Sequence, residues 1–115
     1  MMSAMARAHR TLAEFWPYYL GEHRRPETRA LHYVGTSLVV ALALFALVTG
    51  RWLLLAAVPG AGYLFAWIGH FAVERNRPAN FTYPLWSLAA DFRMWALWLM
   101  GRIGPELDRA GVPRR

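Results

Sequence analysis

Three of the four histidines and two of the seven acidic residues of this chain are candidates for metal chemistry. They are His23, His32 and His70, with Glu74 four residues after His70 and Asp91 further along the chain. Neutral imidazole and carboxylate ligands suit non-haem Fe(II), and they also suit Zn or Mn. Ionisable side chains within apolar segments are costly and usually have a partner or a function. We therefore treat these five residues as one candidate cluster.

Each of these residues also has a purely structural interpretation. A single histidine at a helix end more often forms a hydrogen bond at the membrane interface than a bond to metal. Glu74 could pair with one of three arginines, namely Arg29, Arg75 or Arg77. Asp91 could pair with Arg93 or with an arginine of the loop. Arg77 and Arg93 are also candidates for binding a substrate carboxylate, because a guanidinium makes bidentate pairs with carboxylates. We group Asp91 with these two arginines as predicted substrate-binding residues.

Two long apolar runs must position the histidines. Residues 30–50 and 52–73 contain no formal charge, and a hydrocarbon core about 30 Å thick needs ~20 apolar residues of helix. The runs predict two spanning helices in an antiparallel hairpin that turns near Arg51. His32 lies 19 residues before Arg51 and His70 lies 19 residues after it. Because a helix rises by a constant amount per residue, both imidazoles are predicted to lie at the same height.

The remaining segments predict a single all-α integral membrane domain over residues 1–115. Residues 8–21 carry an aromatic face typical of an N-terminal interfacial helix. A third apolar helix is predicted over 85–103, which makes about three transmembrane helices. Residues 1–10 and 104–115 are predicted to be flexible ends. Since three thin helices barely enclose a buried site, we also expect that the chain could form a homo-oligomer.

The composition excludes several functional classes. The chain has 115 residues, of which 57% are hydrophobic and 17% are charged, and it has no cysteine. A disulfide-stapled secreted domain, a thiolate metal site and a cysteine nucleophile are therefore excluded. The formal net charge is +6, but the arginines stand between the apolar runs, which suits lipid headgroups better than nucleic acid. We expect contacts with membrane lipids and none with nucleic acid.

The placement of arginine predicts the orientation in the membrane. Arg24 and Arg25 precede the first apolar run, Arg75 and Arg77 follow the second, and Arg51 lies between the two runs. An excess of arginine marks the cytoplasmic side of a membrane protein. The histidine end of the hairpin is therefore predicted to face the cytoplasm. A spanning third helix would put the arginines of the C-terminal tail on the opposite side, and the sequence leaves that conflict open.

Longer stretches of the sequence resemble a known family. Residues 19–24 (YLGEHR), 29–36 (RALHYVGT) and 67–79 (WIGHFAVERNRPA) look like the fungal 2-hydroxy fatty acid dioxygenases. Residues 83–88 (YPLWSL) and 91–95 (DFRMW) look like the bacterial branch of the same family. The Gly-His pair followed by Glu-x-x-x-Pro-Ala is the most specific part of the resemblance, which covers nearly the whole chain.

This resemblance implies an Fe(II)-dependent enzyme of fatty acid α-oxidation. Such enzymes use O2 to cleave a 2-hydroxy fatty acid into a fatty acid one carbon shorter. On matching positions His23, His32 and His70 would be the metal histidines, and Glu74 matches the acid that follows the Gly-His pair. These four residues are accordingly predicted to bind metal and to be catalytic. The resemblance also implies an integral protein of the bacterial inner membrane with a fatty-acid-type lipid as substrate.

Two other functions are compatible with the same residues. A non-enzymatic membrane module that binds a lipid headgroup or partner helices would hold no stoichiometric metal. It would also tolerate alanine in place of each histidine of the cluster. A zinc lipid hydrolase would use the same cluster, but it would work without oxygen.

Overall fold

The computed structural model describes residues 11–77 and 83–115. Within that part of the chain every regular element is helical, as predicted. The elements in chain order are α2 (Leu12–Gly21), α3 (Pro26–Thr49), η1 (Trp52–Ala57), α4 (Val58–Trp67), η2 (Ile68–Glu74), α5 (Pro84–Leu99) and α6 (Ile103–Arg109). Of these, η1 is a 3₁₀ helix and η2 is a π-helix. The predicted flexible N-terminal end, residues 1–10, lies outside the described residues.

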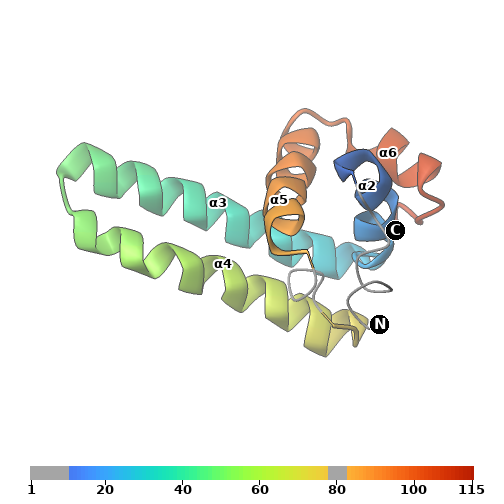
Figure 1. Cartoon of the computed structure of the whole chain (residues 1–115), viewed down its shortest axis with the longest axis horizontal. Helices are drawn as coiled ribbons and strands as arrows, with labels where there is room; N and C mark the ends of the chain where they lie inside the picture. Colours follow the sequence, from blue (N-terminus) through green and yellow to red (C-terminus); the bar gives the residue numbers. More distant parts are fainter. Residues whose placement is uncertain (1–10, 78–82) are drawn as a thin grey trace.

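An antiparallel hairpin of α3 with the run from η1 through α4 to η2 is the longest feature of the molecule (Figure 1). α3 begins at Pro26, whose fixed φ suits a first helical turn, and it ends at Thr49, where the following Gly50 adopts a left-handed φ of 70°. Pro26–Thr49 and Trp52–Glu74 are both long and apolar enough to cross a membrane. They correspond to the two predicted spans.

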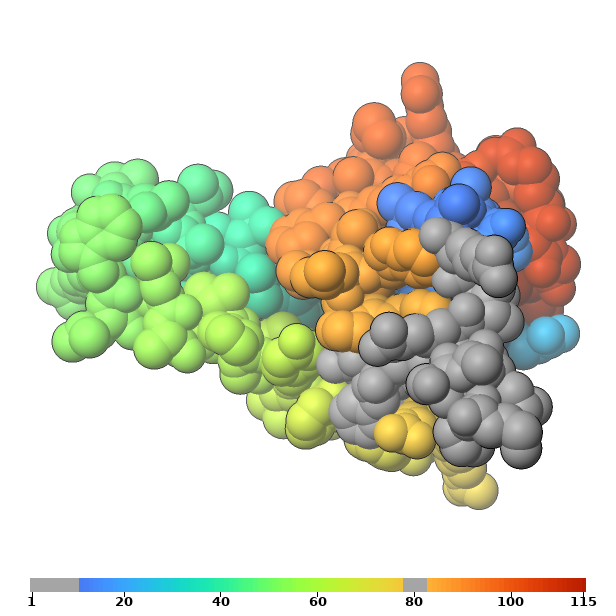
Figure 2. All heavy atoms as spheres, in the orientation of Figure 1, coloured from blue at the N-terminus to red at the C-terminus, as the bar shows by residue number. Residues whose placement is uncertain are grey.

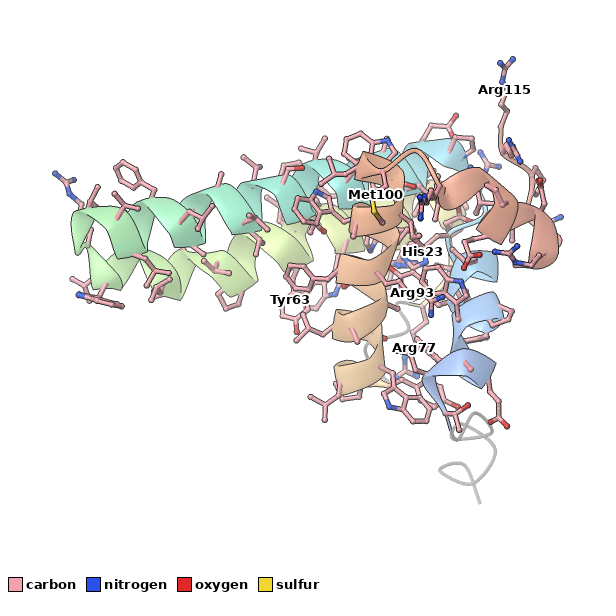
Figure 3. The ribbon with its side chains drawn as sticks, turned by 90° about the horizontal axis from the view of Figure 1, so that it is seen from above. His23, Tyr63, Arg77, Arg93, Met100 and Arg115 are labelled. Atoms are coloured by element: carbon pink, nitrogen blue, oxygen red, sulfur yellow. The ribbon has the colours of Figure 1, made fainter. Side chains whose placement is uncertain are left out.

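The third predicted span forms a helix of a different kind. α5 has 16 residues, which is fewer than the ~20 that a hydrocarbon core requires. It lies across the hairpin rather than alongside it in two perpendicular views (Figures 1 and 3). In the described part of the chain, two helical segments rather than three therefore have the length and hydropathy of a span.

The predicted N-terminal helix is α2. The hydroxyl of Thr11 accepts a 3.1 Å hydrogen bond from the main-chain nitrogen of Glu14, which caps the first turn of the helix. The aromatic face of α2 is buried inside the protein, with Phe15 0%, Trp16 7% and Tyr19 1% exposed. These side chains therefore contribute to the core beside α5, whereas the sequence predicted that they would contact the membrane interface.

The C-terminal segment differs from the predicted flexible tail. Residues 103–109 form α6, and the side chains of Leu107 and Val112 are buried in the same core as Phe15 and Met94. Burial of these apolar side chains fixes the segment against the rest of the protein. The sequence pattern, with Gly and Pro at both ends, had predicted a flexible tail. The tail consequently lies at the end of the molecule that also contains α2 (Figure 1).

The far end of the hairpin stands clear of the other elements (Figure 2). Its large side chains are highly accessible: Val48 is 85% exposed and Leu53 is 91% exposed. Contiguous apolar surface of this kind is rare on soluble monomers and is expected where a protein contacts lipid or a partner. The exposed apolar tip therefore supports membrane association of the hairpin.

Candidate metal centre

The three predicted histidines meet in the interior of the protein. The Nε2 atom of His23 lies 3.1 Å from Nε2 of His32 and 3.0 Å from Nε2 of His70. Their exposed fractions are 1%, 5% and 2%, respectively. His32 comes from α3 and His70 from η2, so the predicted coincidence in height along the hairpin is confirmed. His23 comes from the loop after α2 and lies near the junction of α2 and α5 (Figure 3).

The second nitrogen of each ring has an acceptor that determines its tautomer. Nδ1 of His23 lies 2.7 Å from the main-chain oxygen of Tyr19, and Nδ1 of His32 lies 3.3 Å from that of Thr28. Nδ1 of His70 lies 2.7 Å from the side-chain oxygen of Asn76. Carbonyl oxygens only accept, so each Nδ1 carries the proton. The three Nε2 atoms then present lone pairs to one another.

This donor set fits a metal ion. The Nε2 lone pair of His23 faces two others at 3.1 and 3.0 Å, and all three ligand atoms lie within 4.8 Å of one another. Lone pairs this close repel one another unless a cation lies between them. Burial, followed by the proximity of His32 and His70, holds the pKa of His23 well below its ordinary value. Low basicity keeps the imidazole neutral, which is the form that binds metal. Backbone and amide acceptors on the outer nitrogens are typical of metal-bound histidines.

The π-helix η2 explains how His70 and Asn76 come together. The helix ends at Arg75, which has a left-handed φ of 60°, and the main-chain nitrogen of Asn76 donates to the oxygen of His70 at 2.9 Å. This reversal directs the side chain of Asn76 back to the ring of His70. The side-chain nitrogen of Asn76 donates a 3.1 Å hydrogen bond to the main-chain oxygen of Glu22. Sequence analysis missed Asn76. π-Helical turns frequently occur at functional sites.

Glu74, the predicted fourth metal ligand, lies outside the group of three imidazoles. Its carboxylate accepts a 2.8 Å hydrogen bond from the hydroxyl of Thr28 and another from the main-chain nitrogen of Arg25. It therefore attaches η2 to the start of α3. The prediction placed Glu74 with the imidazoles because it stands four residues after His70, but its carboxylate binds Arg25 and Thr28 instead.

Asp91 is the carboxylate that lies beside the imidazoles. Its Oδ1 atom is 3.7 Å from Nε2 of His32, and it accepts a hydrogen bond from the phenol of Tyr19. Burial, followed by the Asp91 carboxylate, raises the pKa of Tyr19 well above its ordinary value, so the phenol keeps its proton and donates. The structure thus places a carboxylate oxygen beside Nε2 of His32, at the edge of the group of three imidazoles.

Residues 9–103 match the family model of the 2-hydroxy-palmitic acid dioxygenase Mpo1-like proteins. The chain belongs to the Mpo1-like family. The matched region contains all three buried histidines together with Asp91, and it ends where α6 begins. No curated protein and no solved structure matches the chain.

A cavity of about 330 Å³ adjoins the imidazoles of this Mpo1-like chain. At one end its lining is polar and contains the three histidines and Asp91. Away from them the walls are mostly apolar and come from facing sides of three helices. The lining residues are Tyr19, His23, His32, Thr36, Val39, Val58, Pro59, Gly62, Tyr63, Ala66, His70, Ser87, Leu88, Asp91 and Phe92. An amphiphile with a small polar end suits such a site.

The two arginines predicted to bind substrate lie away from this Mpo1-like cavity. The guanidinium of Arg93 stacks on Trp16 at 4.5 Å and lies 3.4 Å from the carboxylate of Glu106. Arg77 is exposed, and Figure 3 places it toward the lower end of α5. Among the described residues, neither arginine lines the cavity.

Proposed function

We propose that this chain is an Fe(II)-dependent membrane dioxygenase that uses O2 to cleave a 2-hydroxy fatty acid into a fatty acid one carbon shorter. The observation that carries the proposal is the cluster of three buried Nε2 atoms at the polar end of an otherwise apolar cavity. Membership in the Mpo1-like family supports the same reaction and substrate class. Imidazole and carboxylate donors suit Fe(II).

Different residues of the chain would bind the metal, bind the substrate and orient these groups. His23, His32 and His70 would hold the iron, and Asp91 would supply a carboxylate oxygen or bind the polar end of the substrate. Bound Fe(II) supplies Lewis acidity and redox chemistry with O2. The phenol of Tyr19 orients the Asp91 carboxylate through its hydrogen bond. The apolar walls exclude water and hold the acyl chain, which brings the reacting groups together.

Arginine placement supports a topology in which the hairpin spans the bacterial inner membrane with its histidine end toward the cytoplasm. Because α5 lies across the hairpin and α6 lies beside α2, the C-terminal segment with Arg115 comes to the end of the hairpin where α3 begins and η2 ends (Figure 3). Arg51, at the tip of the hairpin, is then the exception among the described arginines. This arrangement removes the conflict that a spanning third helix would create.

The test of the proposed function is product analysis with 2-hydroxyhexadecanoate. The protein would be purified without metal, loaded anaerobically with Fe(II), mixed with the substrate and then exposed to O2. We expect pentadecanoate from the wild type and none from the His23→Ala, His32→Ala or His70→Ala variants. Hexadecanoate, which lacks the 2-hydroxyl, is the substrate control. Absence of chain-shortened acid from the iron-loaded wild type would reject the proposal.

Zinc loading distinguishes a hydrolase from the dioxygenase, because three histidines also suit a catalytic Zn²⁺. A hydrolase would be active on ester lipids with zinc and without oxygen. Metal analysis distinguishes the non-enzymatic module, which would contain no stoichiometric metal and would tolerate all three alanine substitutions.

A further inference from the structure

Ser87 has a buried hydroxyl whose hydrogen-bonding capacity is unused. Its side chain is 3% exposed, and in the described part of the chain its Oγ is the one buried side-chain polar atom without a hydrogen-bond partner. A buried hydroxyl without a partner carries a desolvation penalty, so an exception of this kind calls for an explanation. Ser87 lines the cavity that contains the histidines. A ligand in that cavity is therefore the available partner.

The position of Ser87 on α5 determines which part of a ligand it can meet. Ser87 precedes Asp91 by four residues, so both side chains lie on the face of α5 that is directed at the histidines. Leu88 and Phe92 line the same cavity from the adjacent positions. The hydroxyl thus belongs to the polar end of the cavity, where the oxygen-bearing end of an amphiphile would lie.

The rest of the cavity follows one face of α4. Pro59, Gly62 and Ala66 line it at spacings of three and four residues and lie on the same face as His70. Gly62 and Ala66 are four residues apart within α4, so they lie ~6 Å apart along the helix axis, with Ala66 nearer to His70. A Cβ added at Gly62 would lie 3.2 Å from Cγ2 of Val39 on α3. A larger side chain at either position would therefore narrow the cavity at a defined depth.

We propose that the cavity binds a single acyl chain, with an oxygen of its polar end hydrogen-bonded to Ser87 and its hydrocarbon extending past Ala66 to Gly62. The depth of the cavity along α4 then sets the longest chain that binds. This inference rests on the proposed function and deepens it, because it assigns a head-group contact and a chain-length limit to the same site.

The head-group contact is tested by ligand affinity in the absence of turnover. Binding of 2-hydroxyhexadecanoate and hexadecanoate would be measured anaerobically with iron-loaded protein in nanodiscs, by displacement of a fluorescent fatty acid. We expect Ser87→Ala to weaken binding roughly ten-fold, as for loss of a buried hydrogen bond. Ser37→Ala is the matched control, because the Ser37 hydroxyl accepts from Trp95 outside the cavity and its loss should leave affinity unchanged.

The two ligands show which oxygen Ser87 contacts. A loss confined to the 2-hydroxy acid assigns the contact to the 2-hydroxyl, and an equal loss for both acids assigns it to the carboxylate. Unchanged affinity for both acids in the Ser87→Ala variant would overturn the head-group assignment.

The chain-length limit is tested by placing the same side chain at two depths. We expect Gly62→Leu to abolish turnover of the longest 2-hydroxy acids in a series from decanoate to octadecanoate, while shorter acids are still converted. Ala66→Leu, which lies closer to His70, should lower the limit further. Gly60→Leu is the matched control, because an added Cβ there meets nothing within 4 Å. It should leave the profile of chain lengths unchanged.

The longest acid that each leucine variant converts distinguishes a narrowed cavity from a general loss of activity. If both leucine variants reduce turnover equally at every chain length, the depth of the cavity does not limit the length of the acyl chain, although the proposed function stands. If the wild type converts no 2-hydroxy acid of any length, the proposed function itself fails. Val39→Phe, on α3, would obstruct the cavity at the same depth as Gly62→Leu. It serves as the second variant if Gly62→Leu folds poorly, and it should give the same maximum chain length.

Discussion

The guanidinium of Arg29 donates a 2.8 Å hydrogen bond to the main-chain oxygen of His23. The same side chain, which is 3% exposed, also donates to the main-chain oxygens of Arg24, Pro113 and Arg114. One buried cation on α3 therefore attaches both the loop that carries His23 and the C-terminal segment. The placement of the first imidazole depends on this arrangement, because His23 lies in no helix of its own.

Replacement of Arg29 by methionine should destabilise the protein and weaken the metal site. The apolar stem is kept, but four carbonyl oxygens lose a charged donor. We expect at least ~2 kcal/mol of lost stability, seen as a lower thermal midpoint, together with weaker iron binding in competition with a chelator. Arg24→Met, at an exposed position of the same loop, is the control. An Arg29→Met protein with wild-type midpoint and iron affinity would contradict this role.

Asn76→Leu should weaken metal binding without removing a metal ligand. The substitution takes away the oxygen that accepts from Nδ1 of His70 and leaves that ring free to rotate or to change tautomer. Loss of such a partner typically costs 10–100-fold in metal affinity. The measurement is a chelator competition with Co²⁺, whose absorption bands also report the coordination. Affinity equal to the wild type would show that η2 alone orients His70.

Glu74→Ala should lower stability without loss of iron, whereas Asp91→Asn should lower iron affinity without loss of stability. Glu74 links η2 to α3 through hydrogen bonds with Arg25 and Thr28, so its removal should lower stability by about 1 kcal/mol and leave iron stoichiometry intact. Asp91 lies beside His32, so Asp91→Asn should reduce iron affinity at least ten-fold with little change in the thermal midpoint. Loss of bound iron in the Glu74→Ala variant would restore the ligand assignment that was made from sequence.

Single cysteines can test the membrane topology, because the chain has none of its own. We expect a membrane-impermeant maleimide to label Arg51→Cys, at the tip of the hairpin, in intact spheroplasts. Arg102→Cys, after α5, should be labelled only in inverted vesicles. Detergent-solubilised protein, in which both sites should react, is the control. Labelling of both variants from the same side would exclude a spanning hairpin.

Much of the metal site was predictable because helix geometry is regular. The equal separation of His32 and His70 from Arg51 predicts equal height for two α-helical limbs. The 3₁₀ segment η1 and the π-helix η2 change the rise of the second limb, yet the two ring centroids still lie 5.3 Å apart. The place of Glu74 was not predictable in the same way. Its carboxylate binds Arg25 and Thr28, and these contacts between η2 and the start of α3 depend on tertiary packing that the four-residue spacing from His70 does not encode.

By itself, the sequence determined the two apolar helices, their turn near Arg51 and the common level of two imidazoles, because these follow from local composition and a constant helical rise. Only the tertiary structure decided that α5 crosses the hairpin, that Asp91 rather than Glu74 lies beside the imidazoles, and that the C-terminal segment packs next to α2. Those outcomes depend on contacts between residues far apart in the chain, such as Tyr19 with Asp91 and Arg29 with Arg114. Such pairings arise from packing and hydrogen bonding across elements, which no local pattern encodes.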